Sequence, residues 1–305
     1  MLISLLIILS LLNPISTTYL ADRAFFDVSG DVSLTAPERI NPENVGVKVS
    51  AERYVAIDIN SGKILLQNDV EVAQPIASIT KLMTALVILE QNPDWNQVVK
   101  MQEIDETYGA FAHIYRGEEV LFEHLWQAAL VTSDNNSIMA MIRALGLTRA
   151  EFVEKMNDKA LELEMNNSSF SDPTGLSESN QATALDVSRL LYNAMKQEKI
   201  QESVLRGKYT FKILNNNKKR TVYNTDILID SFLNKKKYGY EVVGGKTGYL
   251  PEAGYCLAVK ISHEGNPVAI IVLNSETIET RFQDVKVIAD WVFNNYEWKN
   301  DGSNL

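Results

Sequence analysis

Cysteine and histidine are scarce in this chain of 305 residues, and their scarcity argues against several kinds of active site. The single cysteine, Cys256, excludes an internal disulfide, and its apolar surroundings indicate a core side chain rather than a nucleophile. The three histidines, His113, His124 and His263, show no metal-site spacing. No phosphate-binding glycine loop and no serine in a nucleophile elbow is present. We therefore expect neither a metal nor a cofactor.

Basic residues are outnumbered, with 29 Lys and Arg against 39 Asp and Glu and a net charge of −10. This balance argues against a nucleic-acid partner. The only basic concentration, residues 206–237, contains the runs Lys218-Lys219-Arg220 and Lys235-Lys236-Lys237, which we interpret as solvated loops. A hydrophobic content of 46% is enough to bury a full core, in one large domain or two.

One apolar run, residues 2–12, ends at Asn13-Pro14 and is too short to span a bilayer comfortably. It is typical of the apolar part of a signal peptide, although no Lys or Arg precedes Arg23. We expect residues 1–21 to be a signal peptide or N-terminal anchor. The protein would then lie outside the cytoplasm, in the cell envelope or periplasm, tethered to the membrane if the N-terminus is retained. Residues 22–50 show little periodicity and predict an extended lead-in.

From residue 51 onward the pattern predicts a sheet interrupted by helices. Residues 54–59 and 63–67 form the arms of a hairpin around Asn60-Ser61-Gly62. Helical signals dominate about 95–200, with helices over 120–131 and 137–145 and further starts at 148–151 and 183–186. Strands are predicted at 208–214, 220–224, 240–247, 254–262 and 267–274, and a final helix at about 281–296. The order predicts an α+β fold, in which helices flank an antiparallel sheet that carries an inserted all-helical subdomain.

The run Ser78-Ile79-Thr80-Lys81 opens an apolar stretch with helical spacing. This places Ser78 in the first turn of a buried helix, with Lys81 one turn on and on the same face. A serine hydroxyl needs a neighbouring base, and a lysine whose pKa is lowered by desolvation can serve. Free N–H groups at the helix start would stabilise an oxyanion beside Ser78. Alone the pattern is weak, because it occurs by chance about once in a chain of this length.

Two further triplets follow in order, Ser133-Asp134-Asn135 and Lys246-Thr247-Gly248. Each is expected by chance only a few times in roughly a hundred such chains. The first falls between two helices, where side chains can point into a cleft, although an ordinary turn or N-cap also suits these residues. The glycines at 244, 245 and 248 indicate either a tight bend or a strand along which the backbone of a peptide substrate lies.

These three motifs are the signature of class A β-lactamases and penicillin-binding proteins. Together with Asp172-Pro173-Thr174-Gly175-Leu176, and with residues 244–249 followed by Ala253-Gly254-Tyr255-Cys256, they make the sequence resemble the D-alanyl-D-alanine carboxypeptidases. These enzymes are low-molecular-mass penicillin-binding proteins that trim peptidoglycan stem peptides. The resemblance covers about residues 50–297. It implies a three-layer, β-lactamase/transpeptidase-like fold, with residues 51–297 as the serine D,D-peptidase domain.

The resemblance implies a role for each matching catalytic residue. Ser78 would attack the carbonyl of the penultimate D-alanine while Lys81 takes its proton. Ser133 and Lys246 would form a second proton route, to the leaving amine. Lys246 is also expected to help lower the pKa of Lys81.

The resemblance also implies the contacts to the substrate. Asn135 would hold the amide on the acyl side, and the strand at Gly248 and Tyr249 would line the site. The backbone N–H groups of Ser78 and Tyr249 would form the oxyanion hole. Thr247 and Arg281 would meet the terminal carboxylate.

The expected partner is a stem peptide ending in D-Ala-D-Ala, with β-lactams as inhibitors. A D,D-endopeptidase acting on peptidoglycan cross-links is the first alternative. A β-lactamase is a second, but no glutamate-asparagine segment matches the deacylating base of class A. An inactive peptidoglycan-binding module is the third, disfavoured because every triplet is intact. Asp134 stands where this subfamily commonly has glycine, so we expect a changed cleft wall.

Overall fold

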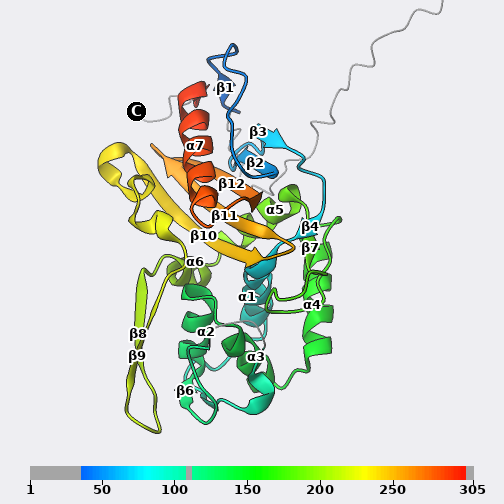
Figure 1. The fold of residues 1–305 in the computed structure, drawn as a ribbon, viewed down its shortest axis with the longest axis vertical. Coiled ribbons are helices and arrows are strands. Elements are labelled where there is room, and N and C mark those ends of the chain that lie inside the picture. Colours follow the sequence, from blue (N-terminus) through cyan, green and yellow to red (C-terminus); the bar gives the residue numbers. More distant parts are fainter. Residues whose placement is uncertain (1–35, 108–111, 300–305) are drawn as a thin grey trace, which may run out of the picture.

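A computed structural model describes residues 36–107 and 112–299, and its centre is a five-stranded antiparallel sheet (Figure 1). The strand order is β10-β11-β12-β2-β3. The strands are β2 (Arg53–Asp58), β3 (Ile64–Asn68), β10 (Tyr240–Leu250), β11 (Gly254–His263) and β12 (Asn266–Ser275). The predicted first hairpin and the three late strands are confirmed. The apolar run at residues 2–12 lies outside the described residues.

Strand β12 shows how both faces of the sheet are buried. Val268, Ile270 and Val272 share one apolar cluster with α7 (Thr280–Asn295). Their neighbours Ala269, Ile271 and Leu273 belong to a second cluster, with α1 (Thr80–Glu90) and α5 (Ala184–Met195). A strand covered on both faces reads as a continuous apolar run instead of alternating. The sheet is therefore the middle of three layers, as predicted.

The insertion between β3 and β10 is mostly helical and fills the lower half of Figure 1. Its other helices are α2 (Phe122–Val131), α3 (Asn135–Ala144), α4 (Arg149–Glu162) and α6 (Glu198–Val204). The capping box that starts α4 is confirmed, because Thr148 and Glu151 each bond the other's backbone N–H. The insertion also holds a short ladder of β5 (Val98–Lys100) and β6 (Glu119–Leu121), so α2 begins later than predicted.

Shorter elements complete the chain. Two-residue ladders join β1 (Glu38–Arg39) to β13 (Tyr296–Glu297) and β4 (Gln74–Pro75) to β7 (Gln181–Ala182). The 3-10 turns are η1 (Ala77–Ile79), η2 (Glu103–Asp105), η3 (Ile227–Asp230), η4 (Phe232–Asn234) and η5 (Lys236–Tyr238). Within the described ranges, none of the helices is long and apolar enough to cross a membrane.

The predicted basic hairpin is present as β8 (Lys208–Lys212) and β9 (Lys219–Tyr223), beside α2 (Figure 1). The interpretation of its runs as solvated loops is wrong for Arg220. This side chain lies in β9 and binds Glu118 through two nitrogens, at 2.5 and 2.9 Å.

Asp284 of α7 joins two distant parts of the chain to the helix. Its carboxylate accepts hydrogen bonds from the Ser50 N–H and hydroxyl, the Ala51 N–H and the Ser275 hydroxyl, at 2.7 to 3.0 Å. The side chain is 5% exposed. It therefore fixes the segment before β2 and the end of β12 against α7.

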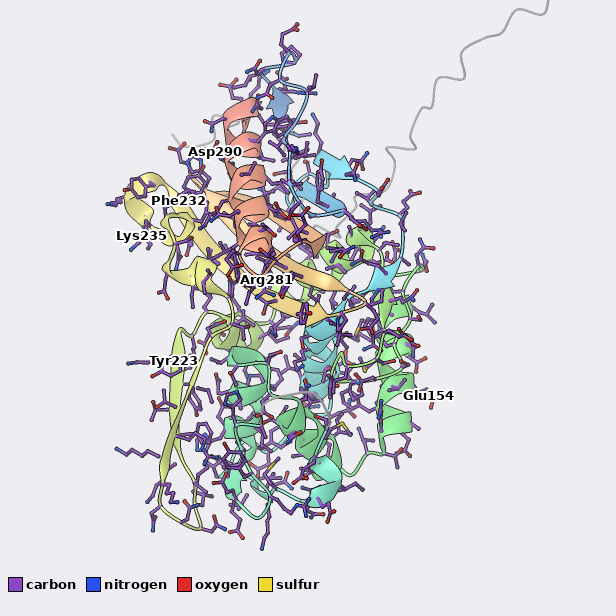
Figure 2. The ribbon with its side chains drawn as sticks, in the orientation of Figure 1. Glu154, Tyr223, Phe232, Lys235, Arg281 and Asp290 are labelled. Atoms are coloured by element: carbon purple, nitrogen blue, oxygen red, sulfur yellow. The ribbon has the colours of Figure 1, made fainter. Side chains whose placement is uncertain are left out.

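Asp284→Ala should lower the free energy of unfolding by about 2–4 kcal/mol, because several buried donors lose a charged acceptor. Thermal or urea unfolding measures this change. Asp290→Ala is the matched control, since Asp290 is on the same helix but exposed (Figure 2). Equal stability of the two variants would contradict the role given to Asp284.

Candidate active site

Ser78 lies in η1 and Lys81 in the first turn of α1. The predicted buried helix is confirmed, with its first turn wound as the tighter 3-10 form. Ala77, immediately before the serine, has a φ of 47°, in the left-handed region that alanine rarely adopts. Such backbone conformations persist only where surrounding contacts enforce them.

A cavity of about 320 Å³ opens beside this turn. Its lining comprises Ser78, Ser133, Asn135, Gly175, Leu176, Thr225, Thr247, Gly248, Tyr249, Leu250, Pro251 and Arg281. The structure thus gathers the predicted site residues from η1, the α2–α3 connection, β10 and α7. The two predicted lysines, Lys81 and Lys246, do not line the cavity and are 0% and 2% exposed.

The Lys81 amine is held by three contacts. Its Nζ lies 2.9 Å from Ser78 Oγ, 2.5 Å from Asn135 Oδ1 and 2.6 Å from the Thr174 carbonyl oxygen. The amide and carbonyl oxygens can only accept hydrogen bonds, so they occupy two N–H groups. In the neutral amine the remaining position is a lone pair, and it faces the Ser78 hydroxyl. The contacts therefore aim the lone pair at the hydroxyl that the sequence predicts to be the nucleophile.

Burial lowers the pKa of Lys81 to about 7, while the carboxylates of Asp172 and Asp134 act in the opposite direction. The expected contribution of Lys246 to this lowered pKa is not found. Instead, burial first, and then the positive charges of Lys81 and Arg281, hold the pKa of Lys246 well below its usual value. Near neutral pH, a substantial fraction of the Lys81 amine is uncharged and able to accept a proton.

Ser133 and Lys246 are both brought to the site, but no hydrogen bond joins them. Ser133 has a φ of 65°, and its buried Oγ has no hydrogen-bond partner within the described residues. The Nζ of Lys246 donates to the carbonyl oxygen of Thr247 at 3.1 Å. Ser133 belongs to the cavity lining, and within the described residues no protein group competes for its hydroxyl.

Asp134 lies between Ser133 and Asn135 in the sequence, but its side chain does not line the cavity. Its carboxylate accepts the Ser137 N–H at 2.8 Å, capping α3, and the His113 N–H at 2.6 Å. It is absent from the cavity lining. The cap interpretation of the triplet is therefore correct for Asp134, while Ser133 and Asn135 face the cavity. Asp134, which stands where the subfamily commonly has glycine, therefore anchors the backbone at His113.

Two glycines allow other backbone segments to close around η1. A Cβ on Gly175, whose φ is 86°, would lie 2.2 Å from the Ala77 carbonyl oxygen. A Cβ on Gly248 would lie 2.8 Å from the Ile76 carbonyl oxygen. The sequence indicated a tight bend or a substrate backbone at Gly248. The structure shows that the protein's own backbone, at Ile76, also approaches this glycine. Gly244 lies at a bulge in β10, against Met195.

Arg281 lies in the first turn of α7, near the middle of the molecule (Figure 2). It is 5% exposed, donates from Nη1 to the Gly248 carbonyl oxygen at 3.1 Å, and leaves Nε without a partner among the described residues.

Thr247 Oγ1 lies 2.7 Å from Thr225 Oγ1. Sequence reasoning missed Thr225, because a single threonine in a loop carries no pattern. Nearby Asp226 is buried, which raises its pKa to about 6.

The histidines and the cysteine lie outside the cavity lining. Cys256 is buried, which raises the pKa of its thiol to about 11 and suits a core residue. His113 and His124 bond Thr132 and Tyr209. In the part of the chain that the structure describes, no three His, Cys, Asp or Glu side chains gather as metal ligands.

The comparisons with known proteins agree on the family and differ in the reaction that each relative is named for. The family described as "D-alanyl-D-alanine carboxypeptidase", peptidase S11, matches residues 38–277. A D-alanyl-D-alanine endopeptidase of Pseudomonas aeruginosa is 30% identical over 264 residues, 85% of this chain and 83% of that protein. The D-alanyl-D-alanine carboxypeptidase DacF of Bacillus subtilis is 32% identical over 257 residues, 81% of this chain and 63% of that longer protein. The crystal structure of the Streptomyces K15 DD-transpeptidase superposes with a TM-score of 0.75 at 28% identity, covering 82% and 99% of the two chains.

The rate of Ser78 acylation by a β-lactam should depend on the neutral form of Lys81. We expect it to fall about tenfold per pH unit below pH 7, where the amine becomes protonated, and to level off above that pH. Lys81→Arg should reduce acylation by several orders of magnitude in protein that still folds, because the guanidinium stays charged and cannot accept the proton. A rate that stays constant from pH 5 to 8, or near-normal acylation of Lys81→Arg, would assign the base to another group.

Proposed function

Because this chain belongs to the D-alanyl-D-alanine carboxypeptidase family of serine DD-peptidases, we propose that it removes the terminal D-alanine of peptidoglycan stem peptides through an acyl-enzyme on Ser78. One observation carries the proposal. The Nζ of a fully buried Lys81, with a pKa of about 7, lies 2.9 Å from Ser78 Oγ. Thr247 and Arg281, which line the adjoining cavity, are proposed to bind the substrate carboxylate.

In the acylation step, Ser78 Oγ attacks the carbonyl carbon of the penultimate D-alanine while Lys81 takes the hydroxyl proton. The negative charge moves to the carbonyl oxygen, which the N–H groups of Ser78 and Tyr249 stabilise. Loss of one such donor typically costs roughly 10²–10³ in rate. Asn135 both positions Lys81 and offers its amide to the acyl side of the peptide.

Departure of the D-alanine requires a proton on its nitrogen. Ser133 Oγ, which has no other partner in the described structure, donates it and is reprotonated by the proton that Lys81 took from Ser78, so Lys81 becomes neutral again. Lys246, whose lowered pKa favours a neutral amine, can relay this proton because it accepts one and releases it readily. Water then attacks the ester, with neutral Lys81 again as the base.

Thr247 and Arg281 are suited to a carboxylate beside the leaving nitrogen, which a carboxypeptidase substrate always has. Arg281 suits a carboxylate because its guanidinium can bind both oxygens, and Thr247 adds a hydroxyl donor. Burial lowers the pKa of Arg281, which shows the cost of holding this charge away from water. A substrate carboxylate would offset that cost.

A D,D-endopeptidase is the second candidate, supported by the name of the Pseudomonas relative. A cross-link whose amine is attached to an α-carbon also has a carboxylate next to the leaving nitrogen. For such a link, Thr247 and Arg281 serve both reactions. The choice then depends on whether the cavity accepts a side chain larger than the methyl group of D-alanine.

The remaining alternatives have less support. A β-lactamase requires a base that hydrolyses the acyl-enzyme quickly, and no glutamate or other carboxylate lines the described cavity. An inactive binding module would not need a buried neutral lysine at the nucleophile. Residues 51–297 are proposed as the peptidase domain, and residues 1–21 as the export signal or anchor that delivers it to the cell envelope.

Penicillin should acylate Ser78 and remain bound, because the nucleophile is activated while a deacylating carboxylate is missing from the described lining. The intact-protein mass should rise by one drug molecule, and Ser78→Ala should show no increase. An adduct that disappears within seconds would indicate a β-lactamase instead. An unmodified Ser78 in folded protein would contradict the acyl-enzyme proposal.

Arg281→Ala should reduce hydrolysis of a pentapeptide ending in D-Ala-D-Ala by one to two decades, since a charge-assisted contact contributes about 1.5–3 kcal/mol. The same peptide with an amidated C-terminus should be slow in both proteins. A dimer cross-linked through a side-chain amine, which has no carboxylate at that position, should be affected little.

Product mass spectrometry reports all three reactions, and the melting temperatures of Arg281→Ala and Arg281→Lys separate binding from folding. Equal losses on every substrate would show that Arg281 supports the fold rather than the carboxylate.

A further inference from the structure

A second cavity, of about 400 Å³, adjoins the catalytic one. It is lined by Ile104, Glu106, Thr107, Met139, Arg149, Asp172, Leu176 and Ser177. Leu176 lines both cavities, so the two meet at this side chain. We call the second one the acyl-side cavity.

The position of the acyl-side cavity in the fold indicates which end of a substrate it would receive. None of its lining residues comes from β10 or α7, the elements that carry Thr247 and Arg281. Met139 lies about one turn after Asn135 on α3, the residue proposed to hold the acyl-side amide. The cavity therefore extends from the catalytic centre away from the carboxylate site, toward the part of the peptide before the scissile bond.

One charge in this cavity is available to a ligand. The Arg149 side chain is 57% exposed, and its one polar contact within the described residues is from Nη2 to Asp172 Oδ1, at 3.3 Å. The Asp172 carboxylate is already occupied by the Thr174 hydroxyl and the Leu176 N–H, at 2.7 to 3.0 Å.

The other acid in the lining is Glu106, which is bound through both oxygens by Arg116, at 2.7 and 2.9 Å. Within the described residues the remaining donors of Arg149 have no partner. The cavity thus presents a guanidinium fork anchored at one nitrogen, beside the apolar side chains of Met139 and Leu176.

We propose, resting on the function proposed above, that the acyl-side cavity is a substrate subsite in which Arg149 binds a carboxylate on an acidic residue of the stem peptide before the scissile bond. An extended peptide advances about 3.3–3.6 Å per residue, so a residue two or three positions before that bond reaches the neighbouring cavity. The exposed donors of Arg149 match a carboxylate, and the two apolar side chains cover the aliphatic part of the same residue. Arg149 is a specificity residue and touches no reacting atom.

The test uses two peptides ending in D-Ala-D-Ala that differ only in an acidic residue two positions before the scissile bond, free in one and amidated in the other. The wild-type protein should hydrolyse the free acid about tenfold more efficiently, with the difference in KM, as expected for a charge-assisted contact on an exposed arginine. Arg149→Gln should remove the preference, and Arg149→Lys should keep part of it. Arg206→Gln, at an exposed arginine beside β8, is the matched control and should keep the full preference.

Binding of both peptides to Ser78→Ala gives a second readout that needs no turnover. A preference of that variant for the acid, lost on adding Arg149→Gln, supports the subsite even if hydrolysis is undetectable, in which case only the proposed function fails. A wild-type protein that treats the two peptides alike overturns the proposal. Equal losses on both peptides in Arg149→Gln also overturn it, since they would show that Arg149 acts only through Asp172 and the fold.

Discussion

A lysine amine without contact to water is the constraint on which the rest of the site depends. The Nζ of Lys81 is surrounded by Ser78, Asn135 and Thr174, which belong to three separate segments of the chain. Burying an ammonium ion is costly, so the protein holds this group near the point where it is half neutral. Two opposing carboxylates, Asp172 and Asp134, limit how far its pKa falls. The same burial that costs stability therefore produces the neutral amine that the proposed reaction needs.

The fold supplies the rigidity that this arrangement needs. Strand β10 is an edge of the sheet, but η1 packs against it at Gly248, and the Asp172–Leu176 segment packs against the other side of this turn at Gly175. The inner strands β11 and β12 hold the outer strands in place. Helix α7 covers one face of these inner strands, and α1 and α5 cover the other. A small shift of any of these layers would move the Lys81 acceptors relative to Ser78. Contacts outside the cavity lining, such as those that Asp284 makes one turn after Arg281 on α7, hold these layers together.

Local patterns predicted most of the fold and the centre of the site. The glycine turn after residue 59, the capping box at Thr148 and the serine-lysine spacing at 78–81 are short-range features that tertiary packing left in place. Other features depend on contacts between distant segments. The left-handed turn at Ser133, the approach of Ile76 to Gly248, the hydroxyl of Thr225 and the effect of Lys81 on Lys246 follow from packing that no local pattern encodes. The interpretation of Arg220 as part of a solvated loop was wrong for the same reason, because its partner Glu118 is remote in the sequence.

The central claim is that about half of the Lys81 amine is neutral near pH 7 while it faces Ser78. The most direct measurement is an NMR titration of the unliganded protein labelled with ¹³C and ¹⁵N at lysine side chains, with the Lys81 signal assigned by its loss in Lys81→Arg. We expect a midpoint near pH 7. A midpoint above about 9, close to that of an ordinary lysine, would mean that the amine is charged in the resting protein and would contradict the account.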